Sequence, residues 1–174
     1  MMHSSWTVLL CRFISMSFIT FFSLHSLAAT SVGADPGSVP SNTVITLQRG
    51  GCEKRCAVYK IIVFADGTVI YHGQYYVRRN GPGLNRVDVS VIRRLIEDFQ
   101  AINYFSLKDQ YGYGDEEECS SVLSDASVAM TSIVTGGRSK AITHHHRCVG
   151  PVPEQLTQLE DKIDQLANSS HWIK

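Results

Sequence analysis

Apolar residues in the first half of the chain are grouped in short runs of the kind that form β-strands. These runs are rich in β-branched and aromatic residues and occupy positions 44–48, 58–64, 68–71 and 74–78. Gly50 and Gly51 separate the first two runs, and residues 65–67 supply turn chemistry before the third. The pattern therefore predicts an antiparallel meander.

Two later segments place apolar residues three and four positions apart, which is the spacing of an amphipathic helix. The first follows Asp88, a suitable N-cap, and its apolar stripe consists of Ile92, Leu95, Ile96, Phe99 and Ile102. The second begins at Pro151 and Pro153, stops near Asn168, and carries the stripe Leu156, Leu159, Ile163 and Leu166. We expect Trp172 to fold back onto the core after this helix.

The region between the helices contains a long polar loop and a hairpin. The loop covers positions 108–125, and the runs 127–134 and 139–145 flank Gly136 and Gly137, a strong hairpin signal. The whole pattern predicts an α+β domain: an antiparallel sheet of about five or six short strands with two amphipathic helices packed on one face.

The N-terminal segment has the charge and hydropathy of a signal peptide. Residues 1–27 contain no acidic residue and one cation, Arg12, before an apolar run over 13–24. This run is shorter than the ~20 residues of a spanning helix, and small residues occupy the positions that a signal peptidase reads. We predict a signal peptide over residues 1–28 with cleavage after Ala28, or after the neighbouring Ala29 as an alternative. A flexible tether over 29–43 and a single domain over 44–174 with no transmembrane segment should follow.

Charge is balanced, with 16 basic and 16 acidic residues. This balance argues against a nucleic-acid partner, because proteins that hold phosphates present a basic face. The one dense basic run, Arg78, Arg79 and Arg86, lies in a Gly-rich loop. No cofactor is expected from any motif in the chain.

Cleavage of the leader removes Cys11 and leaves Cys52, Cys56, Cys119 and Cys148 in an oxidising compartment, where disulfides are the default. Four cysteines allow three pairings, and the sequence does not decide among them. We favour Cys52 with Cys56, which are close in the chain, and Cys119 with Cys148, which flank the predicted hairpin. Export to the periplasm or out of the cell follows from the leader and the cysteines together.

Three consecutive histidines are the main candidates for metal chemistry. On a strand, His144 and His146 project to one face and His145 to the other, a spacing found in zinc and copper sites. Cys52, Cys56 or Asp125 would have to supply further ligands. The alternative is a solvated strand end beside a disulfide, which we prefer because an oxidised Cys148 is no ligand.

Two other segments are weaker candidates for chemistry. Cys52 and Cys56 are separated by three residues instead of the two of thioredoxin-like sites, although Lys54 and Arg55 would lower the pKa of a reduced thiol. The acidic run 115–118 lacks the alternating ligands and the turn glycine of an EF-hand loop. We interpret the first as a structural disulfide and the second as a solvated loop.

One set of residues in the mature chain forms a pattern shared with a known family. These residues are Cys52, Cys56, Tyr59, Asp66, Gly67, Val69, Tyr71, Gly73, Pro153, Leu156, Leu159, Ile163, Asp164 and Trp172. Through them, the segment from Ile45 to Ile173 resembles the domain of unknown function 6438 family, whose members are bacterial and often exported. The resemblance implies an α+β domain and supports export, and it brings no catalytic residues.

Two functional hypotheses follow. The first, which we prefer, is a non-enzymatic binding or interaction module of the bacterial envelope that uses a sheet face or the loop around Tyr111 and Tyr113. Its partner is expected to be an envelope protein or a small molecule. The second is a small metal-dependent or thiol-redox envelope protein built on Cys52, Cys56, His144 and His146.

Overall fold

The computed structural model describes residues 38–112 and 119–173. The predicted signal peptide, the acidic run 115–118 and Tyr113 lie outside the described residues. Of the predicted tether, residues 38–43 are described, and they are anchored: Val39 packs against the core, and Thr43 is buried with its hydroxyl 2.8 Å from that of Thr135.

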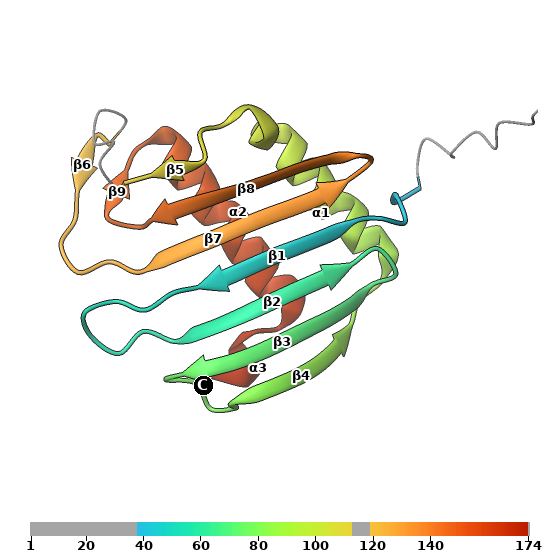
Figure 1. The fold of residues 1–174 in the computed structure, drawn as a ribbon, viewed down its shortest axis with the longest axis horizontal. Helices are drawn as coiled ribbons and strands as arrows, with labels where there is room; N and C mark the ends of the chain where they lie inside the picture. Colours follow the sequence, from blue (N-terminus) through green and yellow to red (C-terminus); the bar gives the residue numbers. More distant parts are fainter. Residues whose placement is uncertain (1–37, 113–118, 174) are drawn as a thin grey trace, which may run out of the picture. The chain divides into compact units, whose positions relative to one another are not determined.

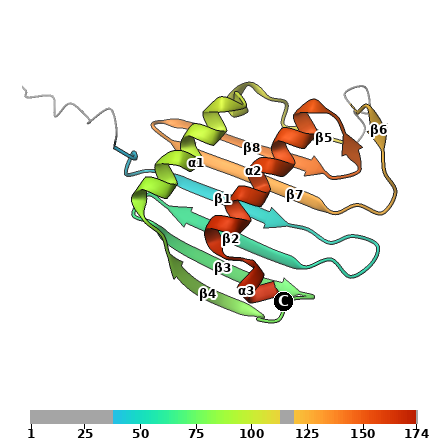
Figure 2. The ribbon, with the colours of Figure 1, turned by 180° about the vertical axis from the view of Figure 1, so that it is seen from behind.

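The chain folds into one large sheet with helices on one side (Figures 1 and 2). Its strands are β1 (Val44–Arg49), β2 (Val58–Phe64), β3 (Thr68–Tyr75), β4 (Gly81–Arg86), β5 (Gln110–Tyr111), β7 (Val128–Thr135) and β8 (Arg138–His145). A second, two-stranded sheet pairs β6 (Ser121–Val122) with β9 (Cys148–Val149). The helices are α1 (Val89–Ala101), the short 3₁₀ helix η1 (Tyr104–Ser106), α2 (Pro151–Ala167) and α3 (Ser170–Ile173).

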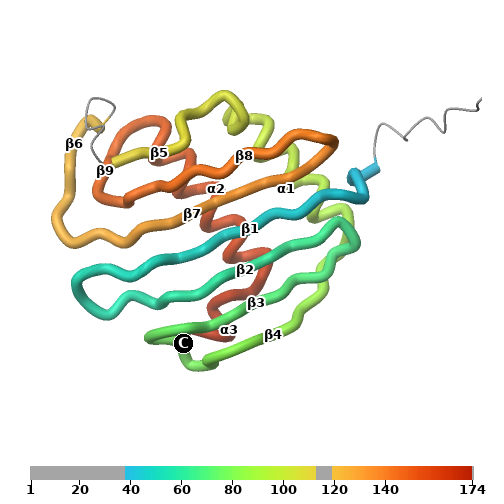
Figure 3. The backbone as a smooth tube through the Cα atoms, in the orientation of Figure 1, coloured from blue at the N-terminus to red at the C-terminus, as the bar shows by residue number. Residues whose placement is uncertain are grey.

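The strand order is β4-β3-β2-β1-β7-β8-β5, so β1 lies between β2 and β7 although β7 comes much later in the chain (Figure 3). All neighbouring strands are antiparallel except β5, which runs parallel to β8. The α+β class and the two helices on one face are confirmed. The predicted number of strands was too low because β4 and β5 were not predicted. The sheet is mixed because β5 runs parallel to β8, and this two-residue strand is too short to leave a pattern in the sequence.

Strand β4 was missed for a specific reason. Gly81, Pro82 and Gly83 resemble a loop, yet they form an edge strand, where a missing N–H costs no hydrogen bond on the open side. Gly83 also makes room for the indole of Trp172, whose nearest carbon would lie 3.0 Å from an added Cβ. The runs 68–71 and 74–78, predicted as two strands, belong to the single strand β3. It ends at Tyr75, because Tyr76 adopts a φ of 53° and the chain then bends away.

The helices begin, end and pack as their patterns predict. Asp88 caps α1 by accepting a 2.7 Å hydrogen bond from the Ser90 N–H, and Asn168 ends α2 in the left-handed conformation. The apolar stripes of both helices face the sheet, and Trp172 stacks on Tyr71 with ring centroids 5.4 Å apart. The buried helix residues are Ile92, Leu95, Phe99, Pro153, Leu156, Leu159, Glu160, Ile163 and Ala167.

Part of the predicted polar loop over 108–125 is buried in the core. Tyr111 is only 3 % exposed, and its hydroxyl accepts a hydrogen bond from the Lys108 N–H. The hypothesis that Tyr111 contributes to a binding surface is therefore wrong. Within residues 38–112 and 119–173, no helix has the length and hydrophobicity needed to cross a bilayer.

Candidate functional site

Four residues, one on each of four neighbouring strands, are paired in a row across the sheet, and their side chains point toward the helices. Tyr59 on β2 pairs with Arg49 on β1, Arg49 pairs with Ala129 on β7, and Ala129 pairs with His144 on β8. Alternation along each strand points these four side chains to the same face. The buried Ala129 contributes a small side chain between those of Arg49 and His144.

Helix α2 places two carboxylates over this row. Glu160 and Asp164 are one helical turn apart, and the Glu160 side chain is only 1 % exposed. Arg49 binds both: its Nη1 donates to Glu160 Oε2 at 2.8 Å, and its Nε and Nη2 donate to Asp164 Oδ2 at 3.0 and 2.8 Å. Asp161 accepts a further bond from Nη2, and the Tyr59 hydroxyl donates to Asp164 Oδ1 at 2.7 Å.

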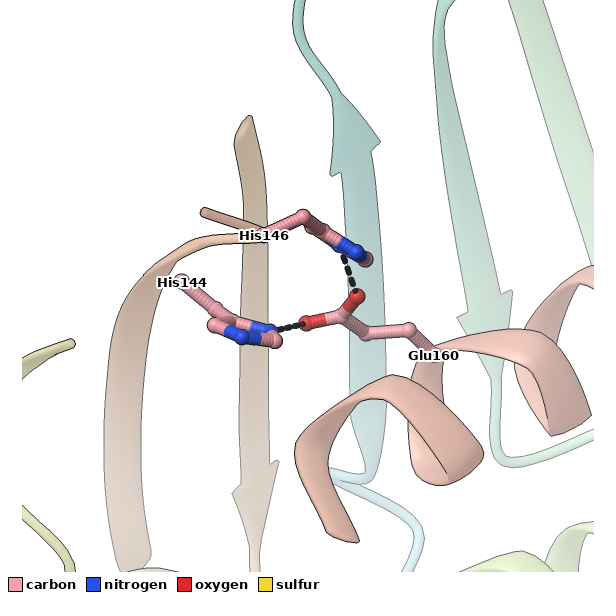
Figure 4. Close-up of side chains that lie close together, drawn as sticks. All are labelled: His144, His146 and Glu160. Carbon is pink, nitrogen blue, oxygen red and sulfur yellow. Dashed lines mark hydrogen bonds and ion pairs between the residues drawn. The ribbon is translucent and has the colours of Figure 1, made fainter. Parts of the chain in front are cut away.

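The two imidazoles predicted to share a face meet at Glu160 (Figure 4). His144 Nδ1 lies 3.0 Å from Oε1, and His146 Nε2 lies 2.8 Å from Oε2. The rings stack with their centroids 4.5 Å apart, so each ring serves one oxygen of the same carboxylate. Sequence reasoning missed Glu160, although an acidic residue inside the apolar stripe of the second helix was a visible signal.

The electrostatics of this cluster keep Glu160 ionised. Burial alone would raise its pKa, but hydrogen bonds from His144 and His146 and the charge of Arg49 lower the pKa to about 2. Burial would likewise lower the pKa of Arg49, and the carboxylates of Asp164 and Glu160 raise it above its ordinary value instead. Each imidazole therefore donates an N–H to an ionised carboxylate.

The depressed pKa of Glu160 predicts a loss of stability in acid. The folded pKa of about 2 lies below the ordinary value of 4.5, so the stabilisation is present above about pH 4.5 and is lost as the pH falls toward 2. We expect the free energy of unfolding to fall by about 3 kcal/mol over this interval from Glu160 alone. Urea unfolding across this range measures it.

A matched pair of variants isolates the contribution of Glu160. In Glu160→Gln the pH dependence below 4.5 should be much shallower, whereas Glu154→Gln, an exposed position in the first turn of α2, should keep the wild-type dependence. An unchanged acid dependence in Glu160→Gln would refute this assignment.

The comparison with protein families gives a match that spans the cluster. A family model described as a domain of unknown function, DUF6438, matches residues 43–167, which include all the residues of the cluster. The chain belongs to the DUF6438 family. A search of curated proteins gave no match.

At this site of the DUF6438 domain, the set of donor atoms favours metal binding, whereas a neighbouring guanidinium opposes it. Donor atoms of His144, His146 and Glu160 lie within 4.8 Å of one another, and two histidines with a carboxylate are a zinc-binding set. However, the Arg49 guanidinium already binds the carboxylate and lies 3.1 Å from His146 Nε2. A metal on His144 Nδ1 would also move its proton to Nε2, a buried atom with no acceptor among the described residues.

The other predicted ligands are engaged elsewhere in the DUF6438 domain. Cys52 is bonded to Cys56, and Cys119 is bonded to Cys148, which are the two pairs favoured from the sequence. Asp125 accepts a hydrogen bond from the Glu53 N–H and lies 3.4 Å from Lys54 Nζ. As disulfides, the cysteines provide neither thiolate ligands nor a nucleophile.

A second group of functional candidates lies at the turn between β3 and β4, at the end of the sheet near α3 (Figures 1 and 2). We name residues 75–80 the hairpin tip. Tyr75 and Tyr76 are 67 % and 60 % exposed, and Arg78 and Arg79 follow them. Tyrosine and arginine, with tryptophan, are enriched at binding hot spots, so the hairpin tip is a candidate binding surface.

Proposed function

We propose that this protein is a non-enzymatic binding module of the bacterial envelope, exported and oxidised, which engages a protein partner through the hairpin tip. The observation that carries the proposal is the pair of exposed tyrosines beside two arginines. Single exposed apolar residues are ordinary on protein surfaces, whereas adjacent aromatic and guanidinium groups provide both contact area and hydrogen-bond donors.

The conformation of Tyr76 supports this proposal. Its φ of 53° lies in the left-handed region, which costs a residue with a Cβ about 1 kcal/mol and costs glycine nothing. The chain therefore holds an exposed aromatic side chain at a position that favours glycine. Strained residues of this kind cluster at ligand-binding surfaces.

The charge of the surrounding strands favours an acidic partner. Residues 67–87 contain no Asp or Glu, and Arg78 and Arg79 lie at the tip; Arg86, at the other end of β4, is paired with Asp66. The edge of β4 is a poor alternative surface for strand addition, because Pro82 removes one N–H from it. The partner is therefore expected to contact side chains at the tip, and its surface is expected to carry carboxylates.

Site-specific cross-linking in the producing bacterium tests the proposal. A photoreactive phenylalanine analogue replaces Tyr75 in one strain and Gln158, an exposed residue of α2, in another. We expect a discrete cross-linked protein from position 75 and none from position 158.

The captured protein must then bind in purified form. Its affinity should fall at least about tenfold in the double variant Tyr75→Ala/Tyr76→Gly, which keeps a residue suited to the positive φ at position 76. Equal cross-linking from both positions, or unchanged affinity in the double variant, would refute the proposal.

A metal-dependent envelope protein is the second candidate, favoured by the grouping of His144, His146 and Glu160. It predicts stoichiometric zinc or copper in protein purified without chelators, and loss of the metal in Glu160→Gln. A thiol-redox role for Cys52 and Cys56 is the third, and it predicts a reactive thiol in the exported protein. We rank both below the binding module. The Arg49 guanidinium already binds Glu160 at the metal candidate, and Cys52 and Cys56 form a disulfide at the redox candidate.

A further inference from the structure

We propose that a pocket beside the hairpin tip binds a carboxylate of an acidic peptide segment belonging to the partner. This inference rests on the proposed binding function and names the chemistry that the tip recognises. The pocket has a volume of about 490 Å³, and its lining is Arg78, Arg79, Asn80, His171 and Trp172. Its lining residues belong to α3 and to the turn between β3 and β4, two segments that lie side by side in Figure 2.

Main-chain hydrogen bonds fix the two walls of the pocket relative to each other. The Arg78 N–H donates to the Ile173 oxygen at 3.2 Å, and the Arg79 N–H donates to the Trp172 oxygen at 3.0 Å. The indole of Trp172 is held from the core side by its stack on Tyr71. The pocket is thus built from ordered parts of the chain, which lowers the entropic cost of binding.

Arg79 is oriented before any ligand arrives. Its Nε donates to the Pro82 oxygen at 3.1 Å, and its guanidinium carbon lies 5.1 Å from the centroid of the Trp172 ring. This hydrogen bond uses one of the five N–H donors of a guanidinium, whose planar fork matches a carboxylate. Stacking on an aromatic ring and pairing with a carboxylate are compatible uses of the same group.

The charge of the lining selects an anion. Arg78 and Arg79 belong to the lining of the pocket, and none of its lining residues is acidic. The carboxylates of α2 that lie closest in the chain to Trp172 are bound elsewhere, since Asp164 pairs with Arg49 and Tyr59. A carboxylate in the pocket would therefore meet no fixed negative charge from its lining.

The exposed tyrosines favour a peptide as the source of the anion. Tyr75 and Tyr76 come shortly before the lining segment 78–80 in the chain. Their exposed aromatic rings are not part of the pocket lining. A free inorganic anion would use only the pocket, whereas a peptide with an acidic side chain also places neighbouring residues against these rings.

Tryptophan fluorescence tests the proposal directly. The chain contains two tryptophans, Trp6 and Trp172, so Trp6→Phe leaves the pocket indole as the only reporter whether or not the leader is removed. The probes are a short glutamate-rich peptide, the same peptide with glutamine in place of glutamate, and inorganic phosphate.

We expect a saturable fluorescence change with the glutamate peptide, and an affinity that falls at least about tenfold in Arg79→Ala and less in Arg79→Lys. Arg94→Ala, on the exposed face of α1, serves as the matched control and should leave the affinity unchanged. The glutamine peptide should give no saturable response.

Three results would overturn the carboxylate assignment: no saturable change with the glutamate peptide, an equal response to the glutamine peptide, or tighter binding of inorganic phosphate than of the peptide. As a control, the unfolding temperature of Arg79→Ala should be close to that of the wild type. A loss of binding in this variant then results from the change in the pocket and not from unfolding. If cross-linking from Tyr75 succeeds while these titrations fail, the binding function stands and the carboxylate assignment falls.

Discussion

Replacing Arg49 with methionine is expected to lower the free energy of unfolding by about 3 to 5 kcal/mol, the range found when one partner of a buried ion pair is removed. The Arg49 side chain is 12 % exposed and is the cation that faces Glu160 and Asp164 in the cluster under α2. Without it, Glu160 remains buried with hydrogen bonds from two imidazoles but without the charge of the guanidinium. Urea unfolding at neutral pH measures the loss.

Two further variants separate charge from shape. Arg49→Lys keeps the charge but cannot bind both carboxylates through a planar fork, so its loss should be intermediate. Arg94→Met, at an exposed position of α1, should change stability by no more than about 0.5 kcal/mol. A loss below about 1 kcal/mol in Arg49→Met would show that the cluster does not anchor α2.

Removing the disulfide between Cys119 and Cys148 is expected to have the second large effect. The bond joins residues 29 positions apart, and the chain-entropy model gives a stabilisation of about 3 to 4 kcal/mol for a loop of this length. The double variant Cys119→Ala/Cys148→Ala removes both sulfurs and leaves no buried hydroxyl. Thermal and urea unfolding should agree on the loss.

The disulfide between Cys52 and Cys56 provides the internal comparison. It closes a loop of only 4 positions, so Cys52→Ala/Cys56→Ala should cost about 2 kcal/mol, clearly less than the longer loop. The reverse order of the two losses would mean that local structure, and not loop closure, determines the contribution of each bond.

The main helices and strands could be predicted from the sequence because their signals are local. The apolar spacing of α1, the N-cap Asp88 and the paired glycines of the β7–β8 turn each act within a few residues, and the structure confirms all three. The edge strand β4 was missed because its Gly and Pro residues are tolerated only through its position at the edge of the sheet.

The candidate site was predictable only in part. The shared face of His144 and His146 follows from strand alternation, and it is confirmed. Their meeting with Glu160 and Arg49 depends on the strand order, which puts β1 two positions from β8 and α2 above both. No local pattern carries that order, so the cation that neutralises the site could not be assigned from the sequence.

Mass spectrometry and elemental analysis of protein recovered from the exported fraction test the central claim most directly. An exported, oxidised binding module should begin at Ala29, contain Cys52–Cys56 and Cys119–Cys148 as disulfides, and hold no stoichiometric metal. A cytosolic product that retains residues 1–28 with reduced cysteines, or one that carries one zinc or copper per chain, would contradict it.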